Sequence, residues 1–286
     1  MWDPDQYLVF GDERSRPFVD LVRRIDVESP QRIVDLGCGP GNLTALLSRR
    51  WPEATVTGID SSPEMIEAAR AVAEPGRLDF EAADLRSWTP DAALDGSTDG
   101  STDRPTDGPI DVIVANATLQ WVPGHLALLE RFVGWLAPGG CLAFQVPGNF
   151  RAPSHRLLSE LRRDPRWAER VGEGAERHLE VEDPAGYAAA LLDGPVPVRV
   201  DAWETTYLHL LTGPDPVLEW VKGTGLRPVL ARLDDSWDDS GDESRNDGRA
   251  AFLAEYGARL RAAYPRRPDG CTPFPFRRIF VVAHRS

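Results

Sequence analysis

The residues from Ile33 to Gly41 read IVDLGCGPG, and this stretch decides the fold. An apolar run reaches Asp35 and passes into glycines with the spacing G-x-G-x-G, at Gly37, Gly39 and Gly41. Glycine lets the chain turn tightly and lets a ligand approach the backbone, because it has no Cβ atom. The stretch therefore predicts a strand, a glycine-rich loop and a helix, which is the unit that opens nucleoside-binding α/β folds.

The glycine spacing distinguishes two classes of nucleoside-binding loop. A dinucleotide fold uses G-x-G-x-x-G, whereas Asn42 stands where the third glycine of that motif belongs. Asp35, just before the loop, suits a cationic ligand such as the amino group or the sulfonium end of S-adenosylmethionine. The loop therefore favours an S-adenosylmethionine site. A nicotinamide-dependent oxidoreductase and a non-catalytic nucleoside-binding protein stay open as alternatives.

Short β-branched runs alternate with amphipathic stretches, which is typical of βαβ units and a doubly wound, mostly parallel sheet. The predicted strands are Arg32–Leu36, Thr55–Asp60, Arg77–Ala82, Ile110–Ala115, Cys141–Val146, Val198–Leu211 and Arg278–Ala283. The predicted helices are Asn42–Arg50, Pro63–Ala73, Asp183–Leu192, Pro216–Gly223 and Ala250–Tyr264, and residues 151–180 also tend to be helical. Pro138-Gly139-Gly140 is expected to form a turn that stops the preceding helix.

The charge is concentrated in two polar segments, so it says little about the site. Residues 91–109 carry a net charge of −4 and residues 234–249 carry −5, which is most of the formal charge of −13. We expect Asp95–Gly108 and Asp234–Arg249 to be flexible surface loops, because they hold too few apolar residues to pack. The acidity also argues against a nucleic-acid substrate, which needs a basic surface.

The start of the chain has no signal-peptide pattern, and no window reaches the roughly 18 apolar residues that span a bilayer. The three cysteines are too few and too scattered for a disulfide framework or a metal cluster. We expect a cytoplasmic protein that needs neither a membrane nor a metal.

Polar residues follow the next three predicted strands, where parallel strands meet at one edge of the sheet. Asp60 is placed to accept both ribose hydroxyls, although Ser61, Ser62 and Pro63 also make this region a good helix start. Met65 is expected either along the adenine or in the core.

Asp84 is a candidate for the adenine amino group, with help from the backbone of Leu85, and Asn116 is expected beside the methyl donor. The alternative for Asp84 is a simple turn residue. The residues assigned to the cofactor are Asp35, Gly37, Gly39, Gly41, Asp60, Ser61, Met65, Asp84, Leu85 and Asn116.

The ordered blocks IVDLGCGPG, GIDSSPEM, AADL and VIVANATLQW resemble class I S-adenosylmethionine-dependent methyltransferases over residues 30–147. A narrower resemblance, to bacterial trans-aconitate 2-methyltransferases, covers nearly the whole chain apart from the two acidic segments. It rests on WDPDQYLVFGDERSRPFVDLV, ANATLQWVPGH, WETTYLHLL, WVKGTGLRP and FPFRRIFVVAHR.

This resemblance implies a seven-stranded sheet with its last strand antiparallel, and a helical cap. It divides the chain into a cap segment (1–29), a cofactor-binding core (30–150), a cap insertion (151–181), a core helix and strand (182–212), a second cap insertion (213–272) and a closing strand (273–286). It also implies methyl transfer from S-adenosylmethionine to one carboxylate of trans-aconitate, which gives a monomethyl ester and S-adenosylhomocysteine.

An acceptor carboxylate is already ionised at neutral pH, so this reaction needs no general base, and we predict positioning residues only. Arginine pairs are the natural grip for the other carboxylates of a polyacid. The predicted substrate-binding residues are Tyr7, Arg14, Gln120, Trp121, Trp220 and Arg227. Further candidate cations are Arg16 and either Arg277 or Arg278, and Tyr207 and His209 are candidates for the pocket lining. A methyltransferase for another small-molecule acid, hydroxyl or amine is the main alternative. The oligomeric state is left open.

Overall fold

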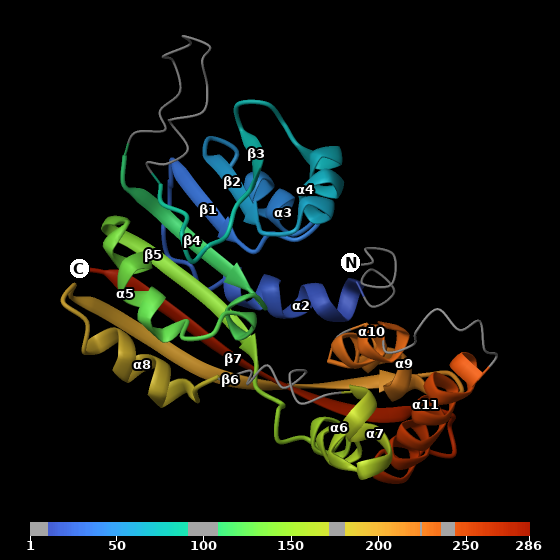
Figure 1. Ribbon diagram of the computed structural model, residues 1–286. Helices are drawn as coiled ribbons and strands as arrows, with labels where there is room; N and C mark the ends of the chain where they lie inside the picture. Colours follow the sequence, from blue (N-terminus) through green and yellow to red (C-terminus); the bar gives the residue numbers. More distant parts are fainter. Residues whose placement is uncertain (1–10, 91–107, 172–180, 224, 236–243) are drawn as a thin grey trace. The chain divides into compact units, whose positions relative to one another are not determined.

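The described residues form a seven-stranded sheet with the strand order β3-β2-β1-β4-β5-β7-β6 (Figure 1). The computed structural model describes residues 11–90, 108–171, 181–223, 225–235 and 244–286, without the side chains of 11–14, 227–228, 234–235 and 244–247. The strands are β1 (Arg32–Leu36), β2 (Thr55–Asp60), β3 (Leu78–Ala82), β4 (Ile110–Asn116), β5 (Leu136–Pro147), β6 (Val198–Leu211) and β7 (Thr272–Arg285).

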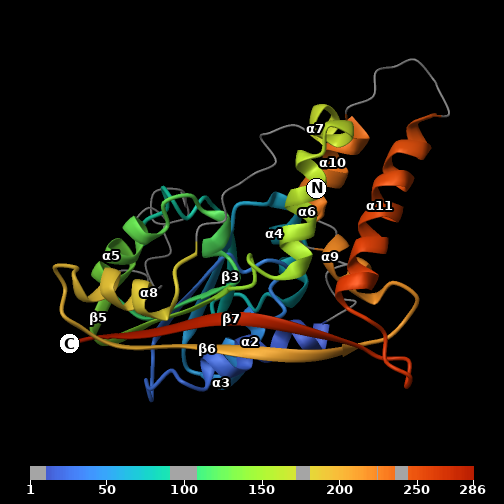
Figure 2. The same cartoon turned by 90° about the horizontal axis from the view of Figure 1, so that it is seen from below.

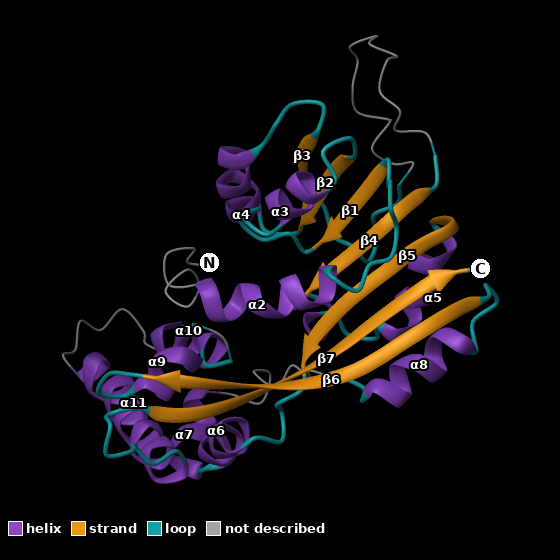
Figure 3. Ribbon diagram, turned by 180° about the vertical axis from the view of Figure 1, so that it is seen from behind, coloured by secondary structure: helices purple, strands orange, loops and turns teal. Residues whose placement is uncertain are grey.

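The pairing confirms the predicted doubly wound sheet. Strands β1 to β5 pair in parallel, while β7 runs antiparallel to β5, with Cys141 opposite His284. The arrowheads of β1, β2 and β4 therefore point to the same edge of the sheet (Figure 3). Polar residues that follow these strands are brought to this carboxyl edge, as the sequence pattern predicts.

The chain divides into two compact units, and β6 and β7 contribute residues to both. Unit 1 comprises Met1–Pro147, Glu180–Thr205 and Arg278–Ser286, and unit 2 comprises Gly148–Leu179 and Thr206–Arg277.

Unit 1 has helices on both faces of its sheet, with α5 and α8 on one face and α2 and α3 on the other (Figure 2). Its helices are α2 (Gly11–Val22), α3 (Thr44–Arg50), α4 (Pro63–Ala69), α5 (Leu126–Gly134) and α8 (Pro184–Leu192), with short 3₁₀ turns η1 (Arg70–Val72) and η3 (Leu119–Trp121).

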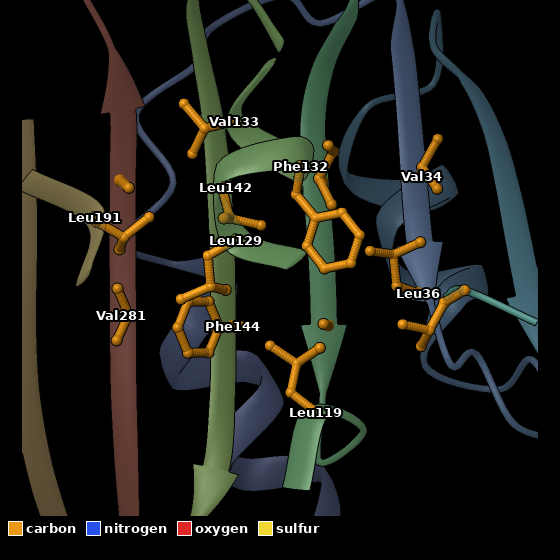
Figure 4. Packing of buried hydrophobic residues seen from close by; sticks show 14 of the residues in the cluster. Val34, Leu36, Leu119, Leu129, Phe132, Val133, Leu142, Phe144, Leu191 and Val281 are labelled. Carbon is orange, nitrogen blue, oxygen red and sulfur yellow. The ribbon is translucent and has the colours of Figure 1, made fainter. Parts of the chain in front are cut away.

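The core of unit 1 fills the space under α5 and α8 (Figure 4). Leu129 of α5 lies against Phe144 of β5, Phe132 of α5 lies over β4, and all three side chains are fully buried. Phe144 also meets the Tyr187 ring of α8 edge-on, with 5.1 Å between centroids. Each such side chain contributes roughly 1.5–3 kcal/mol by leaving water, so this layer holds the sheet edge in place.

Unit 2 is built from helices around an aromatic cluster. Its helices are α6 (Pro153–Arg163), α7 (Pro165–Val171), α9 (Pro216–Lys222), α10 (Arg227–Asp235) and α11 (Ser244–Ala263). The hydroxyl of Tyr256 donates to the Ser154 carbonyl (2.8 Å), and the Ser154 amide donates to the Tyr264 hydroxyl (3.1 Å). These bonds join α11 and its end to the start of α6.

Several predicted boundaries are wrong, and the closing strand β7 begins at Thr272, six residues before the predicted start at Arg278. Helix α5 ends at Gly134, before Pro138, and Gly139 (φ +78°) lies in an irregular start of β5, where the register with β4 shifts. Helix α11 begins at Ser244, so the end of the predicted loop at 234–249 is helical. Packing of later turns, at Phe252 and Tyr256, holds residues whose own propensity is low. The predicted loop at 95–108 lies outside the described residues, except for Gly108.

Candidate functional site

The loop after β1 takes the conformation for which glycine is required. Gly37, Gly39 and Gly41 have φ angles of +77°, +56° and +77°. A Cβ atom on Gly37 would stand 2.2 Å from the Thr118 hydroxyl, and one on Gly41 would stand 2.7 Å from the Phe80 ring. The conformational reason for these glycines is therefore confirmed, whereas their contact with a ligand stays a prediction.

Hydrogen bonds tie this loop to the neighbouring strand ends. The amides of Gly37 and Cys38 both donate to the Ile59 carbonyl of β2, at 2.7 and 2.9 Å. The Thr118 hydroxyl, from the loop after β4, donates to the Gly37 carbonyl at 3.3 Å. The glycine loop is thus held from both sides, and its backbone is preformed.

Asp35 near the end of β1 is a buried carboxylate, with 2% of its surface exposed. One oxygen, Oδ2, accepts a hydrogen bond from the Thr44 hydroxyl at 2.7 Å. The other oxygen, Oδ1, is buried and has no hydrogen-bond partner among the described residues. Burial raises the pKa of Asp35 to about 7, the Thr44 bond opposes the rise, and the charge of Asp60 adds to it. A bound ammonium group would satisfy the remaining oxygen and restore the charge.

Asp60 at the end of β2 joins the glycine loop to the start of α4. Its Oδ2 accepts from the Gly39 amide (3.0 Å) and its Oδ1 accepts from the Ser62 amide (2.9 Å). The helix cap is Ser62, whose hydroxyl accepts from the Met65 amide (3.3 Å). Asp60 is therefore not the cap. Because an ionised oxygen accepts about two hydrogen bonds, each oxygen retains capacity for a ribose hydroxyl.

The two other residues assigned beside Asp60 differ in exposure. Ser61 is exposed, and Met65 is buried with 4% of its surface exposed. The burial of Met65 suits a core contact, which was one of its two predicted roles. Its contact with adenine stays a prediction.

Asp84, directly after β3, is paired with Arg86. Its Oδ1 accepts from the Arg86 amide at 2.9 Å and from the guanidinium at 3.0 Å. The side-chain bond, followed by the backbone bond, lowers the pKa of Asp84, so the carboxylate is ionised. Leu85 is buried and packs in the core of unit 1. Its carbonyl accepts from Arg131, a residue of α5 that the sequence analysis did not identify.

Comparisons with known proteins indicate the class of protein to which this carboxyl edge belongs. A family described as a methyltransferase domain matches residues 10–187. A protein from Streptomyces avermitilis named trans-aconitate 2-methyltransferase is 51% identical, over all of this chain and 97% of its own. A protein of the same name from Streptomyces coelicolor is 53% identical, over 99% of this chain and 86% of its own.

The chain belongs to the trans-aconitate 2-methyltransferase family. It is therefore a methyltransferase, and S-adenosylmethionine is its methyl donor. Among solved structures, the YcgJ protein from Bacillus subtilis is similar with a TM-score of 0.53 and 12% identity, over 94% of this chain and 98% of that chain. That similarity concerns the fold alone.

The residues of this methyltransferase fit its donor. The unpartnered oxygen of Asp35 matches an ammonium group, and Gly39 faces open space, with no other atom within 4 Å of the place where a Cβ atom would lie. The carboxylates of Asp60 and Asp84 stand at successive strand ends of the same edge. A surface depression of about 510 Å³ lies against α4 and the end of β3, with Glu64, Glu67, Arg70 and Ala82 in its lining. We do not assign the donor to it, because it includes none of the glycine loop.

Asn116 at the end of β4 begins a row of polar side chains across three strands. Its Oδ1 accepts from the Gln145 amide of β5 at 2.6 Å. The side-chain oxygen of Gln145, Oε1, in turn accepts from the Arg278 guanidinium of β7 at 3.3 Å. Gln145 and Arg278 are both buried. The row fixes the Asn116 side chain at the carboxyl edge and places one of the predicted acceptor cations, Arg278, in unit 1.

The turn after β4 carries two of the predicted acceptor residues. Gln120 is buried and donates its amide to the Ala117 carbonyl, while Trp121 is half-buried. The Gln120 Oε1 atom is buried without a hydrogen-bond partner in the described part of the chain. An oxygen cannot donate a hydrogen bond to a carboxylate. Gln120 would therefore bind an ionised acceptor only with its side-chain amide rotated by about 180°, so that the NH2 group takes the place of Oε1. Ala117 has a φ of +54°, an unfavourable value for alanine, so this turn is held under local strain.

The other predicted acceptor residues are more dispersed. Trp220 is 1% exposed in unit 2, where its ring lies 4.6 Å from His209 and 5.7 Å from Phe276 between centroids. Arg16 has a side chain that is 70% exposed, next to Asp20. Arg277 in unit 2 donates to the Gly148 carbonyl at 3.2 Å. Tyr7 and the side chains of Arg14 and Arg227 lie outside the described residues.

Other chemistries find little support at this edge. Burial raises the pKa of the Cys38 thiol far above its ordinary value, so the thiol stays protonated and is a poor nucleophile. In the described residues, no cluster of three His, Cys, Asp or Glu side chains is arranged to hold a metal ion. None of the described helices combines the length and the apolar character needed to cross a membrane.

Proposed function

We propose that this chain methylates one carboxylate of trans-aconitate and releases a monomethyl ester and S-adenosylhomocysteine. The observation that carries the proposal is the identity of about 50% with two proteins of that name over nearly the full chain. The fold and the glycine loop support the donor but say nothing about the acceptor.

On the donor side, we assign the contacts with S-adenosylmethionine to residues of the carboxyl edge. Asp35 takes the ammonium group, and the glycine loop lies against the donor with its bare backbone. Asp60 takes the ribose hydroxyls, with Ser61 beside it, and Asp84 with the Leu85 amide takes the adenine. Met65 and Asn116 complete this set.

On the acceptor side, this chain needs to hold an anion and remove its water. S-adenosylmethionine supplies a methyl group on sulfur; the acceptor oxygen forms the new C–O bond as the C–S bond breaks, and the electron pair stays on sulfur. No proton moves, so the absence of a paired base and nucleophile among the described residues at this edge is compatible with catalysis. Positioning in line is worth up to roughly 7–11 kcal/mol in ideal cases.

The acceptor contacts come from residues that we assign by sequence block. Gln120 and Trp121 lie in the turn after β4. Tyr7, Arg14, Trp220 and Arg227 complete the set, and we propose that the ranges 1–29, 151–181 and 213–272 carry the cap function. Arginines should grip the carboxylates that do not react, because a tight ion pair would weaken the attacking oxygen.

The test is a panel of small acids with a labelled methyl donor. We expect label from the donor to enter trans-aconitate and to be released by mild alkali, as an ester requires. Tricarballylate, citrate and cis-aconitate are the matched controls, because they keep three carboxylates and change the carbon skeleton or the double-bond geometry. Alkali-stable label in an amine or a hydroxyl compound, with none in trans-aconitate, would contradict the proposal.

A further inference from the structure

Arg131 of α5 reaches the segment after β3 and binds its main chain. Nη1 donates to the Arg86 carbonyl at 2.7 Å, and Nη2 donates to the Leu85 carbonyl at 2.5 Å. The guanidinium also lies 5.1 Å from the centre of the Trp135 ring. No carboxylate in the described part of the chain forms an ion pair with it. The planar fork therefore acts on two consecutive carbonyls.

The peptide unit between Leu85 and Arg86 transmits this contact to Asp84. In a trans peptide the C=O and N–H groups point in opposite directions, and no cis peptide is present in the described chain. Arg131 holds the C=O of this unit, so the N–H is directed the other way, where it donates to the Asp84 carboxylate at 2.9 Å. The orientation of Asp84 thus depends on Arg131 through this peptide, in addition to the Arg86 guanidinium, which binds both carboxylate oxygens.

The C-terminal end of α5 also contacts the far end of the segment that follows β3, at Trp88. Trp88 meets Trp135 edge-on, with 5.4 Å between ring centroids, and its Nε1 donates to Glu81 at 3.2 Å. At the near side, the Ala83 amide donates to the Asp60 carbonyl at 3.0 Å. The segment is therefore anchored at both ends, and Arg131 sets its centre.

We propose that Arg131 is a positioning residue for adenine recognition, because it orients the peptide that aims the Asp84 carboxylate. The inference rests on the proposed adenine role of Asp84 and Leu85. It does not depend on which acid is the acceptor. A preorganised carboxylate distinguishes an amino group from an oxygen at the adenine 6-position, since only the amino group donates a hydrogen bond.

The experiment measures the affinities of the whole chain for S-adenosylhomocysteine and for S-inosylhomocysteine, which carries oxygen in place of the 6-amino group. Arg131→Met keeps the aliphatic stem over Trp135 and removes every donor. Arg131→Lys keeps the charge but lacks the planar fork that fixes two carbonyls at once. Arg285→Met is the matched control, because Arg285 also binds two main-chain carbonyls, at Gly134 and Leu136.

We expect the wild-type chain to prefer S-adenosylhomocysteine about tenfold or more. The preference should fall to within about threefold of unity in Arg131→Met, take an intermediate value in Arg131→Lys and stay unchanged in Arg285→Met.

If the Arg131 variants lose affinity for both ligands equally and keep the wild-type ratio, Arg131 is merely structural and the inference is overturned. If Arg131→Met does not fold, the ratio in Arg131→Lys decides. A wild-type chain without any preference would refute the adenine role of Asp84 and this inference together, while methylation of trans-aconitate is measured separately with the labelled donor.

Discussion

Replacing Asp35 by asparagine is expected to stabilise the ligand-free chain at alkaline pH while it weakens donor binding. Asp35 is 2% exposed, and its Oδ1 has no partner among the described residues. The ionised form is therefore held in the fold at a free-energy cost that protonation or a bound cation removes. Asparagine has nearly the same shape and never ionises, so the variant avoids this cost.

The size of the effect follows from the pKa of Asp35, which burial raises from 3.8 to about 7. A raised carboxyl pKa means that the folded state prefers the proton. The stability that the protonated Asp35 side chain contributes is complete below pH 3.8 and is lost as the pH rises through 7. Each pH unit in that window costs about 1.4 kcal/mol. Between pH 5 and pH 8 the advantage of asparagine should therefore grow by about 3 kcal/mol.

The assay is urea unfolding of both proteins without ligand at pH 5, 6, 7 and 8, read as the difference in free energy of unfolding. Asp60 and the Cys38 thiol are the titratable groups beside Asp35, and both are the same in the two proteins. Asp193→Asn, an exposed change at the end of α8, is the control and should show no such trend. A difference between Asp35→Asn and wild type that is constant with pH would refute the reasoning.

Asp60→Ala should weaken S-adenosylhomocysteine binding at least about 100-fold, because it removes two charge-assisted acceptors, and should change the acceptor KM much less. Calorimetry measures the binding and initial rates measure the KM, and equal losses in both would contradict the ribose role. Gly41→Ala should destabilise the chain by roughly 1–3 kcal/mol in thermal unfolding, because φ is +77° and the new Cβ would meet the Phe80 ring at 2.7 Å, and Phe80→Leu should restore part of the loss if the clash matters. Arg14→Ala and Arg227→Ala should each raise the KM for trans-aconitate about tenfold or more with little change in donor affinity, and unchanged acceptor kinetics in both would remove them from the acceptor site.

The strand pattern and the glycine loop could be predicted from sequence because their signals are local. The predicted ranges of β1, β2 and β6 match the observed strands residue by residue. Each of these runs is apolar or alternating and is followed directly by a polar or turn-forming residue, namely Gly37, Ser61 and Thr212. The three glycines could be assigned for the same reason, since a left-handed backbone favours glycine wherever it occurs.

Contacts between distant parts of the chain could not be predicted in this way. Thr118 fills the space beside Gly37 from 81 residues away, and Arg131 reaches Leu85 from 46 residues away. Thr118 lies within the block VIVANATLQW, but nothing in that block indicates that it packs beside Gly37, and an arginine on a helix such as Arg131 is a common surface feature. An arginine within an otherwise apolar helix end was the only available signal for Arg131, and it does not identify the partner.

The charge balance of the reaction decides which end of the donor Asp35 should hold. When a carboxylate takes a methyl group from a sulfonium, two opposite charges vanish, so the transition state carries less charge than the reactants. A carboxylate beside the sulfonium would stabilise the reactants more than the transition state and would slow the reaction. The same carboxylate beside the ammonium group contributes equally before and after transfer, because that charge does not change. Of the two predicted partners for Asp35, the ammonium group is therefore the one compatible with rapid transfer, and the buried Oδ1 should lie at the amino-acid end of the donor.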